Sequence, residues 1–179
     1  MIPRAPLRLA LALDRQWHGA PSREVCGRLE LSRVGGDLQL RALLRQAGTP
    51  RVPTAPPGTR VEGLWNFDVV ECFLAGSGGR YLEIEIGASA HFLLLAFHAR
   101  RLRAHSWPDL RLPTSHGRTP DGAWWAALRV PGALLPSGLR AANACAIAAG
   151  RFLAYHPLPG PIPDFHQPSR WPAARLAER

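Results

Sequence analysis

Residues 64–86 read LWNFDVVECFLAGSGGRYLEIEI, and this stretch decides the fold. Two segments in which apolar residues alternate with polar or aromatic ones flank the run Gly76-Ser77-Gly78-Gly79. A period of two is typical of a β-strand, and glycines between two such segments are typical of a hairpin. The stretch therefore predicts two adjacent antiparallel strands.

The apolar residues also predict the register of this hairpin, because successive side chains of a strand point to opposite faces. The residues expected on the buried face are Val70, Cys72 and Leu74 on the first strand and Leu82, Ile84 and Ile86 on the second. Pairing these two sets places Glu71 and Phe73 beside Tyr81, Glu83 and Glu85 on the other face, with Cβ atoms about 5 Å apart directly across the strands. We therefore expect three carboxylates to crowd one sheet face.

The rest of the chain repeats the strand-and-turn pattern. A second hairpin is expected at 25–45 around Val34-Gly35-Gly36-Asp37, and the apolar run 91–101 is typical of a central strand buried on both faces. Further strands are expected at 123–131 and, broken at Gly150, at 139–156. Proline-rich loops are expected at 48–60 and 107–122, and a surface tail with a final short strand after 158. Short strands without βαβ alternation predict an all-β fold, an antiparallel β-sandwich or barrel.

Length and charge limit the remaining possibilities. A chain of 179 residues with 46% apolar content suits one domain, expected over 1–179. The formal charge is +9, but all 22 basic residues are arginines and they are scattered, with a cluster only at Arg100, Arg101 and Arg103. Because nucleic-acid binding requires concentrated positive charge, we predict no nucleic-acid partner.

The three cysteines form no CxxC pair and are odd in number, which argues against a disulfide framework or a zinc site. They are interpreted as small buried residues. The N-terminal apolar run is broken by Arg8 and ends at Asp14, unlike a signal peptide, and no segment is long enough to span a bilayer. We therefore expect no membrane partner and a cytoplasmic location.

The crowded carboxylates permit two interpretations. Like charges at this spacing repel, so the face requires arginines, a cation or a hydrogen-bonding ligand. One interpretation is an exposed face covered by salt bridges. The other is a polar platform for a sugar, whose hydroxyl groups bind carboxylates and arginine while its C–H face stacks on an aromatic ring. The tryptophans available for stacking are Trp65, Trp107, Trp124, Trp125 and Trp171.

These residues also carry a resemblance to a known family. The matching motifs are Gly63-Leu64-Trp65, Glu71-Cys72-Phe73-Leu74, Tyr81-Leu82-Glu83, and Pro163-Asp164-Phe165-His166-Gln167-Pro168 followed by Trp171. In this order the chain resembles, along nearly its whole length, the family 9 carbohydrate-binding modules and the wider DOMON-like proteins, in particular a stand-alone bacterial branch. The branch usually has Asn, Trp and Tyr where this chain has Glu85, Phe92 and Leu95.

The resemblance implies a jelly-roll β-sandwich and non-catalytic binding of a carbohydrate. In secreted family 9 modules the sugar lies between tryptophans, and bound calcium is common. For this chain we predict no cofactor, with calcium as the one ion the resemblance admits. Asp68 is expected to anchor the start of its strand and is the one weak candidate for a metal ligand.

The histidines are the other candidates for chemistry. No HxH or HExxH spacing occurs. An Asp164–His166 contact could orient an imidazole, but a turn cap that pins the tail is favoured. A haem site would need an axial His or Met pair, and Met1 is the only methionine.

The predicted function is therefore binding of a saccharide. The candidate ligand-binding residues are Trp65, Glu71, Tyr81, Glu83, Glu85, Arg101 and His166. A protein-interaction or structural module, whose open sheet face docks another subunit of a homo-oligomer, is the first alternative. A glycoside hydrolase that uses paired glutamates is the second, although nothing in the sequence places a carboxyl in an apolar pocket.

Overall fold

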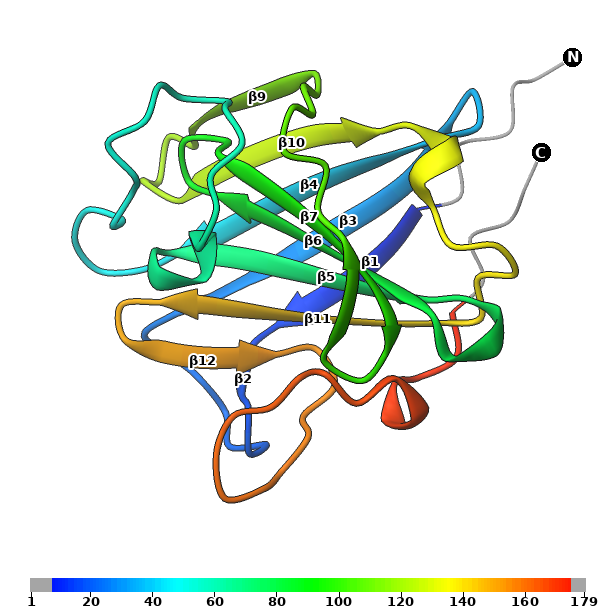
Figure 1. Ribbon diagram of the computed structural model, residues 1–179. Helices are drawn as coiled ribbons and strands as arrows, with labels where there is room; N and C mark the ends of the chain where they lie inside the picture. The colour runs from blue at the N-terminus through cyan, green and yellow to red at the C-terminus, as the bar shows by residue number, and fades with distance from the viewer. Residues whose placement is uncertain (1–7, 175–179) are drawn as a thin grey trace, which may run out of the picture.

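Two antiparallel sheets lie face to face in the computed structural model, which describes residues 8–174 (Figure 1). The first sheet contains, in spatial order, β1 (Arg8–Leu13), β3 (Cys26–Val34), β4 (Asp37–Arg45), β10 (Trp124–Val130) and β9 (Thr114–Arg118). The second contains β2 (Arg15–Gln16), β12 (Arg151–Ala154), β11 (Ala141–Ala148), β5 (Val69–Ala75), β6 (Tyr81–Gly87), β7 (Phe92–Ala99) and β8 (Leu102–His105). The predicted antiparallel β-sandwich is confirmed.

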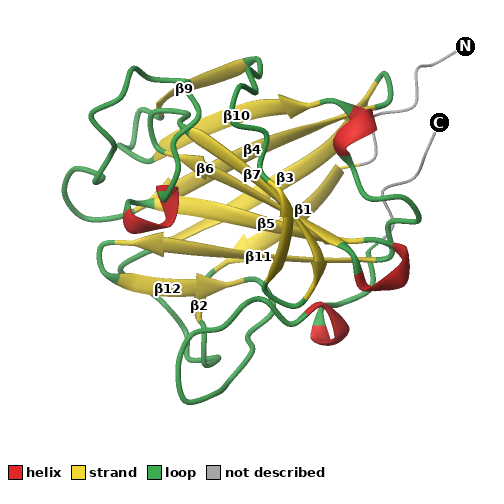
Figure 2. Ribbon diagram, in the orientation of Figure 1, coloured by secondary structure: helices red, strands yellow, loops and turns green. Residues whose placement is uncertain are grey.

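Helical structure is confined to single 3-10 turns in the connections, drawn red in Figure 2. These turns are η1 (Leu64–Asn66), η2 (Ser77–Gly79), η3 (Gly132–Leu134) and η4 (Pro168–Arg170). The alternating sequence explains why the chain forms strands instead of longer helices. Apolar residues with a period of two do not form the continuous stripe through which a helix packs.

The hairpin of β3 and β4 shows how local sequence builds the first sheet. Leu29 pairs with Ala42 and Leu31 with Leu40, and all four side chains are fully buried between the sheets. Gly35 and Gly36 both have positive φ, as the tight turn between paired strands requires. The predicted hairpin is therefore confirmed.

The central hairpin of β5 and β6 has the predicted register. Val70 lies opposite Ile86, Cys72 opposite Ile84 and Leu74 opposite Leu82, and these six side chains belong to the core between the sheets. Glu71 lies opposite Glu85, and Phe73 lies opposite Glu83, on the other face. The three carboxyl groups are therefore neighbours on the outer face of the second sheet.

Most of that outer face is covered, which overturns the interpretation of an exposed face covered by salt bridges. Every residue of β5 and β6 is buried. The segment after β12 and the turn η1 cover the face with a second apolar cluster, which includes Leu64, Leu158, Phe165 and Trp171. Alternation predicts which side chains share a face, but it carries no information on a distant segment that folds over them.

Three further expectations are corrected. β1, β2, β8 and β9 were not predicted: β1 lies in a short apolar run, β2 has two residues, β8 follows the strand expected at 91–101, and β9 lies within a segment interpreted as a loop. The tail has no final strand up to Ala174, where only an isolated bridge joins Ala173 to Ala141; residues 175–179 lie outside the described range. Cys26 is half-buried, while Cys72 and Cys145 are buried.

The core between the sheets predicts a stability difference. Ile84 is fully buried in that core, whereas Leu102 on the edge strand β8 is 59% exposed. Ile84→Ala should lower the free energy of unfolding by about 2–5 kcal/mol, because it removes buried apolar surface and leaves a cavity. Leu102→Ala should change it by less than about 0.5 kcal/mol. Urea denaturation measures both, and equal losses would contradict the described placement of these two strands.

Candidate ligand-binding cleft

A cleft of about 420 Å³ opens on the outer face of the second sheet, between η1, the edge strand β8 and the tail. This volume lies within the range of small-molecule sites. Ten residues line it: Trp65, Glu71, Glu83, Leu95, Phe97, Arg101, Arg103, Pro163, Phe165 and His166. The strands β5, β6 and β7 thus supply two carboxyl groups and two apolar side chains, η1 supplies Trp65, the edge strand β8 supplies Arg103, and the loops supply the other residues.

The turn η1 holds Trp65 at the edge of the cleft. Leu64 is fully buried in the outer cluster, whereas the next residue, Trp65, is 37% exposed. Arg51 fixes the end of the turn, since its Nη2 donates to the backbone oxygen of Asn66 at 2.8 Å. The Trp65 ring is therefore partly exposed at the edge of the cleft, on a turn that a hydrogen bond from Arg51 holds in place.

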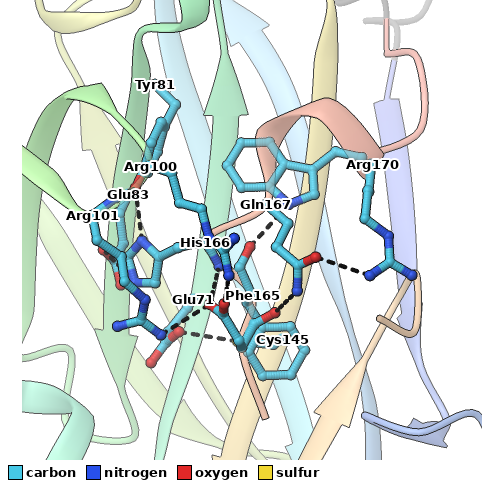
Figure 3. A network of polar contacts seen from close by, with 12 residues as sticks. Glu71, Tyr81, Glu83, Arg100, Arg101, Cys145, Phe165, His166, Gln167 and Arg170 are labelled. Atoms are coloured by element: carbon cyan, nitrogen blue, oxygen red, sulfur yellow. Dashed lines mark hydrogen bonds and ion pairs between the residues drawn. The ribbon is translucent and has the colours of Figure 1, made fainter. Parts of the chain in front are cut away.

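The tail is pinned to the sheet edge through Asp164. Its Oδ1 accepts hydrogen bonds from the backbone N–H of His166 at 3.0 Å and from Nη2 of Arg101 at 2.9 Å, and its Oδ2 pairs with Arg100. Figure 3 shows the two arginines approaching the tail beside His166. The arginines and the backbone bond hold the pKa of Asp164 below its usual range despite partial burial. The predicted turn cap is confirmed.

His166 is oriented by Tyr81. The Tyr81 hydroxyl accepts a hydrogen bond from the backbone N–H of Arg101 at 3.0 Å, so its own proton points to His166 Nδ1, 2.8 Å away. Burial lowers the pKa of His166 to about 4, helped by the nearby arginines, and the ring is neutral near pH 7. The hydrogen-bond network then assigns the ring proton to Nε2, which lies 3.8 Å from Glu83 Oε2. This contact is not an ion pair at that pH.

The three glutamates on the outer face resist ionisation. Burial is the main cause that raises the pKa of each above its usual value. The charge of Glu71 raises the pKa of Glu83 and Glu85 further, and Arg103 opposes these effects only in part. In Glu71 the opposing contribution is a hydrogen bond of 3.0 Å that the Cys145 thiol donates to Oε2.

Glu83 is the polar group on the cleft floor that is left for a ligand. Its side chain is 5% exposed, and within residues 8–174 it takes part in no hydrogen bond. A carboxyl group that is largely buried has lost most of its water, so a hydrogen bond from the cleft would stabilise it. Unlike Glu85, whose oxygens are sealed from solvent, Glu83 lines the cleft and can be satisfied from it.

The structure brings five of the seven candidate binding residues to the cleft: Trp65, Glu71, Glu83, Arg101 and His166. Two lie behind its wall. Tyr81 stacks on Phe97 with ring centroids 4.5 Å apart, and burial raises the pKa of its hydroxyl to about 12. Glu85 is fully buried, and neither oxygen has a hydrogen-bond partner among the described residues.

The other five lining residues were not predicted as ligand contacts from sequence. Phe97 could have been found by alternation, because it shares a strand face with Leu93 and Leu95 opposite Tyr81. Alternation also separates Phe92 from Leu95, since three positions along a strand change the face. Phe92 packs between the sheets, and only Leu95 reaches the cleft. Arg103 and Pro163 follow from tertiary contacts without a local sequence signal.

Among the tryptophans expected to supply stacking rings, only Trp65 lines the cleft. Trp171 is buried against Phe73, with ring centroids 5.3 Å apart, and its Nε1 donates to the Phe165 oxygen at 2.9 Å. Trp124 belongs to the core between the sheets. A single exposed ring can therefore cover one side of a ligand.

Asp68 anchors the start of β5, as expected, and its geometry does not suit a metal ion. Its Oδ2 accepts hydrogen bonds from Gln46 Nε2 at 2.6 Å and from the backbone N–H of Arg51 at 3.1 Å. Within the described range no group of three or more His, Cys, Asp or Glu side chains is arranged to hold a metal. The residues present therefore do not fit the calcium that the sequence resemblance admits.

The fold and the cleft together define a β-sandwich protein with a cleft on the outer face of its second sheet. A mouse UPF0462 protein C4orf33 homolog is 30% identical over 169 residues, which cover 87% of this chain and 85% of that protein. A zebrafish homolog is 32% identical over 130 residues, which cover 66% of this chain and 64% of that protein. The chain belongs to the UPF0462 family.

Comparison with solved structures supports the fold. A crystal structure from Bacteroides uniformis, described as that of a candidate carbohydrate-binding protein, matches with a TM-score of 0.68 and 16% identity, covering 92% of this chain and 84% of that one. No protein-family model matches the sequence. None of the helices in residues 8–174 has the length and apolarity of a transmembrane span.

The buried carboxyl groups predict a pH dependence of stability. The folded pKa of Glu85 is well above the ordinary 4.5, so between these values the folded state binds more protons than the unfolded state. Stability is therefore highest below about pH 4.5 with respect to this group and falls as pH rises through the folded pKa. Glu85→Gln should flatten the fall between pH 5 and pH 8, as measured by urea denaturation.

A surface carboxylate provides the control. The side chain of Glu24 is 72% exposed, so Glu24→Gln should leave the pH dependence of the wild-type protein unchanged. A slope that is the same in Glu85→Gln and in the wild type would show that Glu85 is not protonated in the folded state.

Proposed function

We propose that this chain binds a small saccharide, without catalysis, in the cleft on the outer sheet face. The observation that carries the proposal is Glu83, a buried carboxyl group on the cleft floor that lacks a hydrogen-bond partner within the described range. A hydroxyl group of a ligand would satisfy it, and satisfying a buried polar group contributes more than an exposed hydrogen bond.

The other lining residues suit the same ligand. The exposed Trp65 ring offers an apolar face to the C–H side of a sugar ring. His166 Nε2–H, on the tail, and the guanidinium of Arg101, on the edge of the sheet, offer donors for hydroxyl oxygens. A ligand with one apolar face and several hydroxyl groups matches this combination better than a purely apolar or purely ionic one.

Two comparisons support the proposal. The matching protein from Bacteroides uniformis is described as a candidate carbohydrate-binding protein. The motifs around Trp65, Glu71 and Glu83 also resemble the family 9 carbohydrate-binding modules, and these residues line the cleft. On this basis we assign the chain to the binding-module class as a proposal, with the sugar held by one tryptophan instead of two.

The glycoside hydrolase alternative is supported less well. The sequence did not show whether any carboxyl group lies in an apolar pocket. In the structure Glu71 and Glu83 are buried, and burial raises the pKa of both. A retaining or inverting mechanism, however, needs two carboxyl groups whose pKa values are moved apart, one acid and one ionised. Here burial raises the pKa of both Glu71 and Glu83, and among the described residues neither has a hydrogen-bonded cation that would hold it ionised, which favours binding over hydrolysis.

Docking of another subunit on this sheet face is likewise less well supported. The segment after β12 already covers the face through Leu158, Phe165 and Trp171, all of which are buried. What stays accessible is a cleft with a charged and aromatic lining, and this shape favours a small ligand over a flat protein surface.

A thermal-shift titration with simple neutral and acidic monosaccharides tests the proposal. Saturable stabilisation is expected for the wild-type protein. Trp65→Ala and Glu83→Ala should each weaken binding about tenfold or more, because one removes the stacking surface and the other the buried hydrogen-bond acceptor. Isothermal titration calorimetry then measures the affinity.

A matched aromatic variant controls for general effects of truncation. Phe152 on β12 is 37% exposed, the same fraction as Trp65, but does not line the cleft. Phe152→Ala should retain the wild-type affinity. Absence of saturable binding by any monosaccharide tested, or equal losses in Trp65→Ala and Phe152→Ala, would overturn the proposal; release of reducing sugar from an aryl glycoside would favour the hydrolase.

A further inference from the structure

The arginines beside the cleft outnumber the carboxylates that pair with them. Asp164 pairs with both Arg100 and Arg101, and Glu62 pairs with both Arg60 and Arg103. Each of the two clusters therefore carries one surplus positive charge. Arg101 and Arg103 are the members that line the cleft, and their side chains are 57% and 42% exposed.

Nothing on the cleft floor balances this surplus. Glu71 and Glu83 are the carboxyl groups that line the floor, and burial raises the pKa of both, while the charge of Glu71 raises that of Glu83 further. Glu85 lies beside them, sealed from the cleft, and burial together with the charges of Glu71 and Glu83 raises its pKa. The exposed charges at the cleft are therefore those of Arg101 and Arg103, whereas Glu71 and Glu83 are buried.

The hydrogen-bonding groups of the cleft are mainly donors. Tyr81 donates to Nδ1 of His166, which leaves Nε2–H facing the cleft. Arg101 uses Nη2 for Asp164, and Arg103 uses Nη1 for Glu62, so each guanidinium keeps further N–H groups. A carboxylate is the acceptor that matches such a set best, because a guanidinium binds it through two parallel hydrogen bonds.

Resting on the proposed saccharide binding, we infer that the sugar is an acidic one: a monosaccharide of the uronic acid class, whose carboxylate lies against Arg101 and Arg103 while its ring lies over Glu83 beside Trp65. A cationic amino sugar fits less well, since the two arginines repel it. A neutral sugar leaves the surplus charge of both clusters unmatched.

The experiment compares D-glucose, D-glucuronate, D-glucuronamide and D-glucosamine by calorimetry at pH 7 in 50 mM salt, with the D-galacto series as a second set. Glucuronamide is the matched ligand, because it replaces only the carboxylate by a neutral amide. The uronate of one series should bind at least about tenfold more tightly than its amide and its neutral parent, as expected for a charge-assisted hydrogen bond. Glucosamine should bind most weakly.

Arginine variants locate the effect. Arg103→Gln should lower the affinity for the uronate about tenfold and that for the neutral sugar less than threefold. Arg101→Gln should also lower the affinity for the uronate about tenfold, and it should lower that for the neutral sugar by a smaller factor, because Arg101 also donates to hydroxyl oxygens. Arg45 is the matched control: its side chain is 56% exposed, close to the 57% of Arg101, and it pairs with Asp121 away from the cleft. Arg45→Gln should keep the affinity for the uronate.

The outcomes separate the two proposals. If neutral sugars bind as tightly as uronates, or if the uronate affinity survives in both Arg101→Gln and Arg103→Gln, the inference of an acidic ligand is overturned and saccharide binding stands. Preferred binding of glucosamine overturns it as well. If no sugar of either series binds, the proposed function fails and the inference falls with it.

Discussion

The antiparallel pairing of β5 with β6 is the constraint on which the outer face of the molecule depends. Cys72 opposite Ile84 locks the apolar side chains of both strands between the sheets. A slip of one residue would send them outward and bring Glu71 and Glu83 into the core, at a cost that no contact there could offset. The same pairing that builds the sandwich therefore forces carboxyl groups together on the opposite face.

The cleft is the part of the outer face that the covering segments leave open. Over most of the outer sheet face, residues such as Phe165 and Trp171 complete a second apolar cluster around the carboxyl groups. Between Trp65 and the edge strand β8 the cover stops, and Glu83 is left with a cavity in front of it. Natural sequences are locally consistent except where function intervenes, so a buried acid without a partner is the kind of conflict expected at a binding site.

Sequence reasoning succeeded where the physics is local. Alternation and glycine turns predicted the hairpins, the register and the shared face of Glu71, Glu83 and Glu85. It could not predict burial of that face, because burial depends on a segment about 80 residues away in the chain. For the same reason Tyr81 was taken as a ligand contact although its hydroxyl bonds His166 across 85 positions. The apolar residues of the tail were the feature of the sequence that indicated that the tail could cover this face.

The Tyr81–His166 hydrogen bond joins two parts of the chain that are synthesised at different times. Strands β5 and β6 can pair as soon as they leave the ribosome, but the wall that His166 and Asp164 give the cleft does not exist until that much later part has been synthesised and has folded back. Until then Glu71 and Glu83 lack the cover that the tail provides. Closure of the tail buries them, which raises their pKa values, and the cleft is complete only after translation has passed His166.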